Sequence, residues 1–163
     1  MYTQVDRVMC FIDGSNMYNG LTASFGERRI HFARLLDGLA AGRLLVQAYY
    51  YTVPNAYNRA FIIAITRNPL VILRSGQQGF NGREKLVDTR LSSDMVRLAY
   101  ANTYDIAILI SGDGDYVDAV AYVRAVGKRV EGYSFASNSS QALRRACDRY
   151  TIMDAEFLEP YWL

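Results

Sequence analysis

The chain has 163 residues, of which 51% are hydrophobic and 21% charged, and its formal net charge at neutral pH is +2. These values fit one globular domain over residues 1–163 and exclude a disordered tail and a collagen-like repeat. No apolar run approaches the roughly 20 residues of a membrane-spanning helix, and the first residues lack a signal-peptide pattern, so we expect a cytoplasmic protein without a membrane partner.

Apolar runs along the chain predict a series of buried strands. The first run, residues 8–12, is continuously apolar and stops at Asp13-Gly14, a pattern typical of a strand that is buried on both faces and ended by a turn. The run at residues 106–110 has the same character. Similar runs predict the remaining strands, over residues 44–51, 70–73, 130–135 and 150–153.

Helical patterns separate these runs. The expected helices cover residues 16–24, 31–41, 55–67, 90–102, 115–126 and 139–147. Strands that alternate with helices of this length imply βαβ crossovers and a mainly parallel sheet. We therefore predict an α/β fold in which helices flank both faces of the sheet. The long loop over residues 75–84 carries three glycines and is expected to be a mobile flap.

Acidic residues follow two of the expected strands. Asp13 comes directly after the first strand, and Asp113 and Asp115 follow the 106–110 strand within the sequence SGDGDY. Ligands of an open parallel sheet bind outside the carboxyl ends of its strands. The glycines beside these carboxylates allow tight turns and leave room for a bulky ligand. We therefore expect a ligand site lined by carboxylates at this edge of the sheet.

A third acidic contribution surrounds the start of the helix expected over residues 90–102. Asp88 is placed to cap that helix, and Asp94 borders its apolar stripe instead of pointing fully into solvent. A carboxylate at a half-buried edge needs a partner. That partner is either a metal ion or an arginine one helical turn away, Arg90 or Arg97.

Four or five carboxylates in one crevice repel each other unless a cation neutralises them. Ligation by oxygen alone suits Mg²⁺ or Mn²⁺. Two such ions about 3.5–4 Å apart activate an attacking water and stabilise the leaving oxygen of a phosphodiester. This chemistry needs neither cysteine nor histidine. Cys10 and Cys147 lack zinc-ligand spacing, and the one histidine, His31, is interpreted as a surface or capping residue.

Each carboxylate also has a purely structural interpretation. Asp13 and Asp113 precede glycine and are typical turn residues. Asp88 is a possible helix cap, and Asp115 can complement the positive start of the next helix. Their joint placement favours a metal site over four unrelated structural roles.

Three motifs together resemble the NYN domains, the LabA-like branch of the PIN-like nuclease superfamily. They are FIDGSN at residues 11–16, KLVD at residues 85–88 with Asp94 six residues on, and SGDGDY at residues 111–116. Their order and approximate separations match over nearly the whole chain. The resemblance implies a Rossmann-like, PIN-like sheet with an acidic pocket that binds Mg²⁺ or Mn²⁺ and, in active members, cleaves RNA.

The resemblance also implies roles for the carboxylates. Asp13, Asp94 and Asp113 match the principal metal ligands and catalytic residues, and Asp94 or Asp113 is expected to assist proton removal from water. Asp88 and Asp115 match outer or second-metal carboxylates. The chain departs from the family pattern at residue 86, where leucine replaces the usual glycine, and at residue 114, where glycine replaces a common serine. Neither departure removes a carboxylate.

Other residues are expected to contact an RNA substrate. The resemblance implies that Asn16 orients a ligand or phosphate, and Ser111 belongs to the same group of substrate contacts. Arg83 and Lys85 flank the glycine-rich loop, where they can hold backbone phosphates. Phe80 in that loop either stacks on an unpaired base or packs against the domain.

Competing interpretations fit less well or remain open. A haloacid-dehalogenase-type phosphatase needs Asp-x-Asp after its first strand, whereas Ser15 stands at the second position here. A Toprim domain ends its first strand in glutamate, not in aspartate. A non-catalytic module that keeps the acidic pocket and binds RNA or a protein is not excluded. The aromatic pair Tyr161-Trp162 is expected to pack on the domain or on a second subunit of a homodimer.

Overall fold

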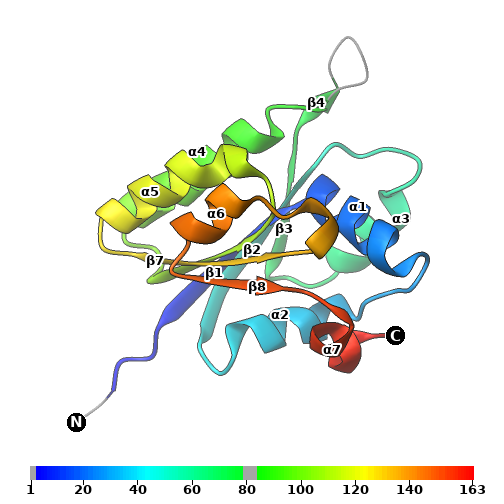
Figure 1. Ribbon diagram of the computed structural model, residues 1–163, viewed down its shortest axis with the longest axis horizontal. Helices are drawn as coiled ribbons and strands as arrows, with labels where there is room; N and C mark the ends of the chain where they lie inside the picture. The colour runs from blue at the N-terminus through cyan, green and yellow to red at the C-terminus, as the bar shows by residue number, and fades with distance from the viewer. Residues whose placement is uncertain (1–2, 79–83) are drawn as a thin grey trace.

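A six-stranded parallel sheet forms the middle layer of the protein (Figure 1). The structure is a computed structural model, and it describes residues 3–78 and 84–163. The strands of the sheet are β1 (Arg7–Asp13), β2 (Leu44–Thr52), β3 (Val71–Ser75), β6 (Ile106–Ile110), β7 (Arg129–Ser134) and β8 (Arg149–Ile152). Their spatial order is β3-β2-β1-β6-β7-β8. The chain therefore winds outward from β1 to one edge, returns to β6 on the other side of β1, and winds out to the second edge.

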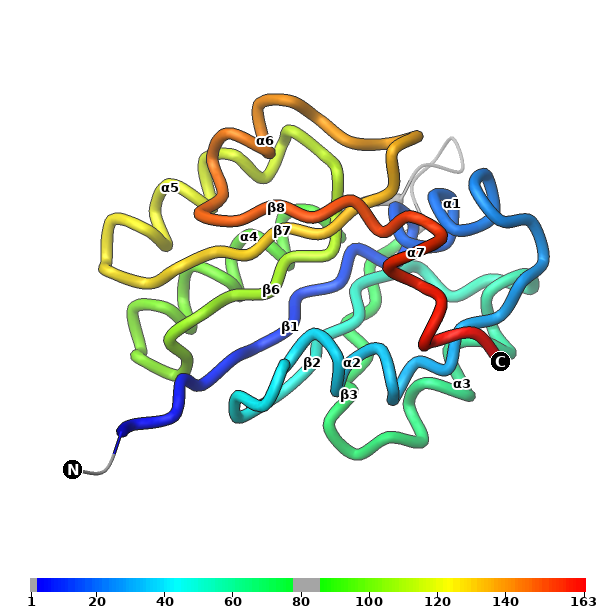
Figure 2. Tube along the Cα trace, turned by 60° about the horizontal axis from the view of Figure 1, so that its bottom comes forward, coloured from blue at the N-terminus to red at the C-terminus, as the bar shows by residue number. Residues whose placement is uncertain are grey.

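Helices cover both faces of this sheet (Figures 1 and 2). One face carries α1 (Gly14–Phe25), α2 (Phe32–Ala40), α3 (Arg59–Ile65) and α7 (Ala155–Leu158). The other face carries α4 (Val87–Tyr100), α5 (Val117–Ala125) and α6 (Gln141–Ala146). Alternate residues of β1 face the two cores, Cys10 and Ile12 toward α1 and α2, Met9 and Phe11 toward α4 and α5. Because both faces of β1 are buried, this strand has to be continuously apolar. The helices on both faces of a parallel sheet confirm the predicted α/β fold.

Element boundaries differ from the predicted ones in several places. A short antiparallel hairpin of β4 (Gln77–Gln78) and β5 (Glu84–Lys85) lies within the expected loop, and the tip of the expected flap lies outside the described residues. Helix α4 begins at Val87, three residues earlier than its apolar periodicity indicated. Asp88 therefore lies inside the first turn and is not the cap, which is Leu86 in a left-handed conformation with φ of 71°. Helix α7 is too short to show a periodic pattern.

The start of α2 and the C-terminal tail of the chain both pack against the rest of the domain. The Nδ1 atom of His31 accepts a hydrogen bond from the backbone N–H of Arg34 at 3.3 Å, which confirms the capping interpretation. The Trp162 ring packs edge-on against Phe25 at 5.2 Å between centroids, and the Arg28 guanidinium lies 3.8 Å above that ring. The tail thus packs on its own domain, and the homodimer stays a prediction. None of the described helices is long and apolar enough to cross a bilayer.

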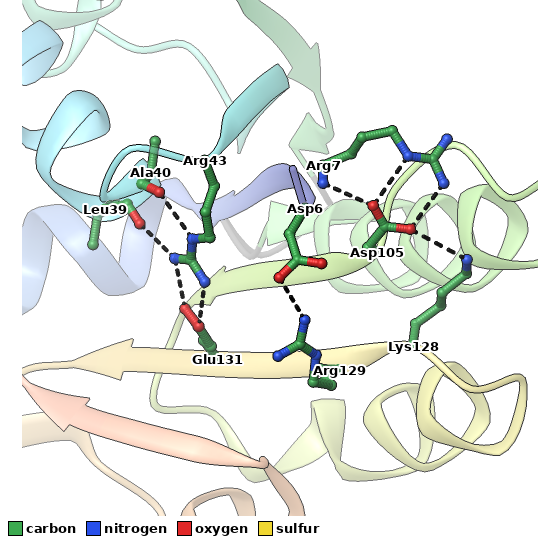
Figure 3. Close-up of polar contacts among 9 residues, drawn as sticks. All are labelled: Asp6, Arg7, Leu39, Ala40, Arg43, Asp105, Lys128, Arg129 and Glu131. Atoms are coloured by element: carbon green, nitrogen blue, oxygen red, sulfur yellow. Dashed lines mark hydrogen bonds and ion pairs between the residues drawn. The ribbon is translucent and has the colours of Figure 1, made fainter. Parts of the chain in front are cut away.

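Ion pairs tie together the amino ends of the central strands (Figure 3). They join Arg7 to Asp105, Arg43 to Glu131 and Arg129 to Asp6, with N–O distances of 2.9, 2.8 and 2.7 Å. Hydrogen bonds from the Arg7 side chain and backbone lower the pKa of Asp105 to about 2. Each of these carboxylates is therefore paired with an arginine, which balances its charge without a bound cation.

Candidate metal centre

Three carboxylates meet at the opposite edge, where β1 and β6 end. Asp13 is the last residue of β1, Asp113 lies in the turn after β6, and Asp88 lies in the first turn of α4. Each offers a carboxylate oxygen, and these oxygens all lie within 4.8 Å of one another. The order of strands reverses between β1 and β6, and a doubly wound sheet opens its ligand crevice at such a reversal. We refer to Asp13, Asp88 and Asp113 as the acidic triad.

Two members of the triad also cap helices. The Oδ1 atom of Asp13 accepts the backbone N–H of Asn16 at 3.2 Å and so caps α1. The Oδ1 atom of Asp113 accepts the backbone N–H of Asp115 at 2.9 Å and caps the 3-10 helix η1 (Gly114–Tyr116). The structural and the chemical interpretations of these residues are therefore compatible, because each cap uses only one of the two carboxylate oxygens.

Buried hydroxyl groups hold the triad in place. The Tyr116 hydroxyl lies 3.2 Å from Oδ2 of Asp13 and 2.9 Å from Oδ1 of Asp88. The Ser111 hydroxyl donates to Oδ2 of Asp13 at 3.2 Å and accepts the backbone N–H of Asp113 at 3.1 Å. Burial and the two carboxylates raise the pKa of Tyr116 far above its usual range, so it stays protonated. The Tyr116 hydroxyl has one proton and can donate it to Asp13 or to Asp88, but not to both at once. The triad therefore keeps excess negative charge.

Among the described side chains, no arginine or lysine balances the charge of the triad. Within residues 3–77 and 86–163, no ion pair reaches Asp13, Asp88 or Asp113, in contrast to the paired carboxylates at the amino edge. Burial raises the pKa of Asp13 to about 6, and the nearby Asp88 contributes to the rise. Asp13 is buried, Asp113 half-buried and Asp88 exposed, and converging carboxylates of this kind without a described counter-charge are a donor set that fits a hard divalent cation such as Mg²⁺ or Mn²⁺.

Asp94 lies outside the triad and has other partners. Its buried carboxylate accepts hydrogen bonds from the Tyr51 hydroxyl at 2.8 Å, from Arg74 Nε at 3.1 Å and from an Arg97 guanidinium nitrogen at 3.2 Å. The predicted pairing with Arg97 is confirmed, whereas Arg90 donates to the carbonyl oxygen of Ser75 instead. Asp94 therefore holds two arginines beside the crevice.

The other expected site residues have varied positions. Asp115 is exposed and lies outside the triad, and Ser111 is fully buried among the carboxylates. The Oδ1 atom of Asn16 accepts the backbone N–H of Gly112 at 3.0 Å, so this amide fastens α1 to the turn after β6. The backbone of Lys85 pairs with Gln77 in the hairpin. Arg83 and Phe80 lie outside the described residues.

Sequence reasoning assigned no role to Tyr116, Tyr51 or Arg74. Tyr116 is the last residue of the SGDGDY motif, so its position beside the carboxylates was the one available signal. Tyr51 and Arg74 lie at the carboxyl ends of β2 and β3, and only the pairing of these strands brings both beside α4. Gly112 is needed for close approach, since a Cβ there would lie 1.8 Å from the carbonyl oxygen of Asn138.

Comparisons with known proteins agree with this architecture. The family model of the NYN domain matches residues 7–154. The chain is similar to a protein of unknown function, VPA0982 from Vibrio parahaemolyticus RIMD 2210633, known from its crystal structure, with a TM-score of 0.81 and 21% identity over 100% of both chains. At that identity the likeness concerns the fold alone. No curated protein matches the chain.

Proposed function

The chain belongs to the NYN domain family, within the PIN-like nuclease superfamily, and we propose that it is a metal-dependent ribonuclease that hydrolyses RNA phosphodiester bonds at the acidic triad. One observation carries the proposal: three carboxylate oxygens lie within 4.8 Å of one another, and no arginine or lysine whose side chain the structure describes pairs with them. The three sequence motifs favour the LabA-like branch of the family.

Asp13, Asp88 and Asp113 are the residues that would hold Mg²⁺ or Mn²⁺. A bound ion of this kind supplies Lewis acidity, which polarises a phosphoryl oxygen and lowers the pKa of water. The protein keeps the three carboxylates converged by the hydroxyls of Ser111 and Tyr116. Because these hydroxyls are already bonded inside the domain, the triad does not need to reorganise when a phosphodiester arrives.

Asp113 is the residue we assign to proton transfer. It is half-buried, and beyond the N–H of Asp115 its two carboxylate oxygens keep lone pairs that can both ligate an ion and accept a proton from attacking water. Asp94 was expected to share this role, but its carboxylate already accepts hydrogen bonds from Tyr51, Arg74 and Arg97. We therefore propose Asp94 as a positioning residue that holds the two arginines.

Cationic side chains near the crevice are proposed to bind the RNA backbone. Arg74 and Arg97 keep 42% and 63% of their side-chain surface exposed while they pair with Asp94. Guanidinium groups of this kind form bidentate contacts to phosphate. Arg83 and Lys85 remain proposed phosphate ligands on sequence grounds, together with Asn16 at the start of α1.

Cleavage of an end-labelled RNA of mixed sequence tests the proposed function. The wild-type protein is expected to cut with Mn²⁺ or Mg²⁺ and not with EDTA. Asp13→Asn should abolish cutting, and Asp113→Asn should slow it by about 10²- to 10⁴-fold, since a general base of the reaction is removed. Asp37→Asn, an exposed change on α2, is the matched control and should cut normally.

Two outcomes would contradict the ribonuclease proposal. Equal cutting by folded wild type and Asp13→Asn would show that the observed activity does not arise at the triad. Retention of the RNA without cutting in any metal would instead favour a binding module that keeps the acidic pocket.

A further inference from the structure

A hollow on the protein surface borders the acidic triad on the α1 side of the sheet. It has a volume of about 380 Å³, within the roughly 300–1,000 Å³ typical of small-molecule sites. Gly14, the residue directly after Asp13, forms part of its wall, so the hollow and the triad share a border. Its other side chains come from α1, from the end of β2 and from the loop between β2 and α3. They include Tyr18, Asn19, Thr52, Asn55 and Tyr57.

The chemistry of this hollow differs from that of the triad. Among the described residues that line it, none carries a formal charge; the lining consists of amides, hydroxyls, tyrosine rings and a glycine. A phosphate would call for arginine or lysine, and a cation would call for carboxylates. Flat aromatic faces beside amide groups suit a neutral ligand that has a π-face and hydrogen-bonding edges.

The loop presents one aromatic ring on an ordered turn. The Oδ1 atom of Asn55 accepts the backbone N–H groups of Tyr57 at 2.8 Å and of Asn58 at 3.0 Å. In return, Oδ1 of Asn58 accepts the N–H of Asn55 at 2.8 Å, and Nδ2 of Asn58 donates to the carbonyl oxygen of Val53 at 3.0 Å. The turn is therefore fixed while the Tyr57 side chain stays 87% exposed at the rim.

Two amide groups in the hollow are available to a ligand. Asn19 is exposed, and its side-chain amide has no hydrogen-bond partner among the described residues. The Nδ2 group of Asn55 likewise donates to none of them, because only its Oδ1 atom is used by the turn. Because hydrogen bonds already hold the turn, its backbone loses little conformational entropy when a ligand binds beside Tyr57.

We propose that this hollow, the base pocket, binds an unpaired nucleobase of single-stranded RNA next to the phosphodiester at the triad. The inference rests on the proposed function, since it takes the substrate to be RNA. A base stacks on the Tyr57 ring and bonds through its edge to the amides of Asn19 and Asn55. A base inside a duplex keeps its stacking and pairing partners, so only an unpaired base can enter.

Binding of a fluorescein-labelled single-stranded RNA, measured by fluorescence anisotropy in EDTA so that no cutting occurs, tests the base pocket. Tyr57→Ala should weaken binding by about 5- to 100-fold, because one base loses its stacking partner. Tyr57→Phe keeps the ring and should bind like wild type. Tyr122→Ala is the matched control: Tyr122 is 59% exposed on α5, on the other face of the sheet, and its loss should leave binding unchanged.

The same RNA annealed to its complement separates base binding from backbone binding. Duplex RNA should bind wild type and Tyr57→Ala equally. Equal binding of the single strand to wild type and a correctly folded Tyr57→Ala would overturn the base pocket, and so would an equal loss for single strand and duplex.

The base pocket and the ribonuclease proposal fail differently. If Asp13→Asn abolishes cutting while Tyr57→Ala binds and cuts normally, the base pocket is wrong and the ribonuclease stands. If wild type never cuts but binds single strands through Tyr57, the base pocket stands and the ribonuclease is wrong.

Discussion

Asp13 illustrates how a single residue can oppose the stability of its own fold. Its pKa of about 6 lies above the ordinary value of 3.8, so the folded protein binds more protons than the unfolded chain between these pH values. The free energy of unfolding should therefore fall as the pH rises from about 4 to about 6, and should stay lower above that range. The carboxylate thus destabilises the metal-free protein at neutral pH, as expected of a group kept for ligand binding.

Replacement of this carboxylate should accordingly stabilise the metal-free protein. We expect Asp13→Asn to raise the free energy of unfolding in EDTA at neutral pH by about 1–3 kcal/mol, because a buried charge is removed. The neighbouring hydroxyls of Ser111 and Tyr116 can reorient to accept from the new amide. Urea denaturation as a function of pH measures this effect. The gain in the free energy of unfolding should shrink as the pH falls from about 6 to about 4. A gain that stays the same over this range would contradict the prediction.

Metal-induced stabilisation distinguishes ligands from positioning residues. Mn²⁺ at 100 times its Kd should stabilise wild type by about 2.7 kcal/mol, visible as a rise in Tm. Asp88→Asn should lose most of that rise. Without metal, Asp94→Asn should have a lower Tm than wild type, because Arg74 and Arg97 lose a partner. Mn²⁺ should nevertheless raise its Tm as much as that of wild type. Loss of the rise in Asp94→Asn would instead identify Asp94 as a metal ligand, as the family resemblance implies.

At the scale of elements, the start of α4 decides where Asp88 lies. Leu86 precedes this helix with φ of 71°, a conformation that a leucine side chain disfavours and glycine adopts freely. The left-handed residue turns the chain out of β5 and lets the helix begin at Val87, which places Asp88 beside Tyr116. The fold therefore tolerates local strain at a residue two positions from a site carboxylate.

Leu86→Gly tests this strain. The side chain is 42% exposed, so little packing is lost, and relief of the left-handed conformation should offset the greater flexibility of the unfolded chain. We expect the free energy of unfolding to rise by up to about 1 kcal/mol, measured by urea denaturation, with Mn²⁺ binding unchanged. A loss of stability above about 1 kcal/mol would show that the Leu86 side chain matters more than its backbone strain.

Across the whole molecule, the two ends of the sheet have opposite electrostatic designs. At the amino ends, Asp6, Asp105 and Glu131 are each paired with a basic side chain (Figure 3). At the carboxyl ends, the acidic triad has hydroxyl donors but no described basic partner. The paired carboxylates are neutralised within the protein, whereas the carboxylates of the triad keep their attraction for a cationic ligand. The same residue type therefore serves structure at one end and chemistry at the other.

Much of this arrangement follows from the sequence alone. The apolar runs identify the six strands, and most clearly the central strands β1 and β6, whose runs are continuously apolar because both of their faces are buried. Asp13 follows one such run directly and Asp113 follows the other after two residues, so their place at the carboxyl edge depends only on local chain order. The capping role of His31 is likewise local, because donor and acceptor are three residues apart.

Only the tertiary structure decided which side chains meet. The sequence places Asp88 at the start of a helix and Asp94 within it and cannot tell which of them reaches Asp13, because that depends on how α4 lies across β1 and β2. The packed fold turns Asp88 toward the triad and Asp94 toward Arg74, which comes from a strand that pairs with β2. Contacts of this kind join segments far apart in the chain, and burial across the whole sheet selects them. Local patterns therefore determined where the carboxylates stand, and long-range packing determined their partners.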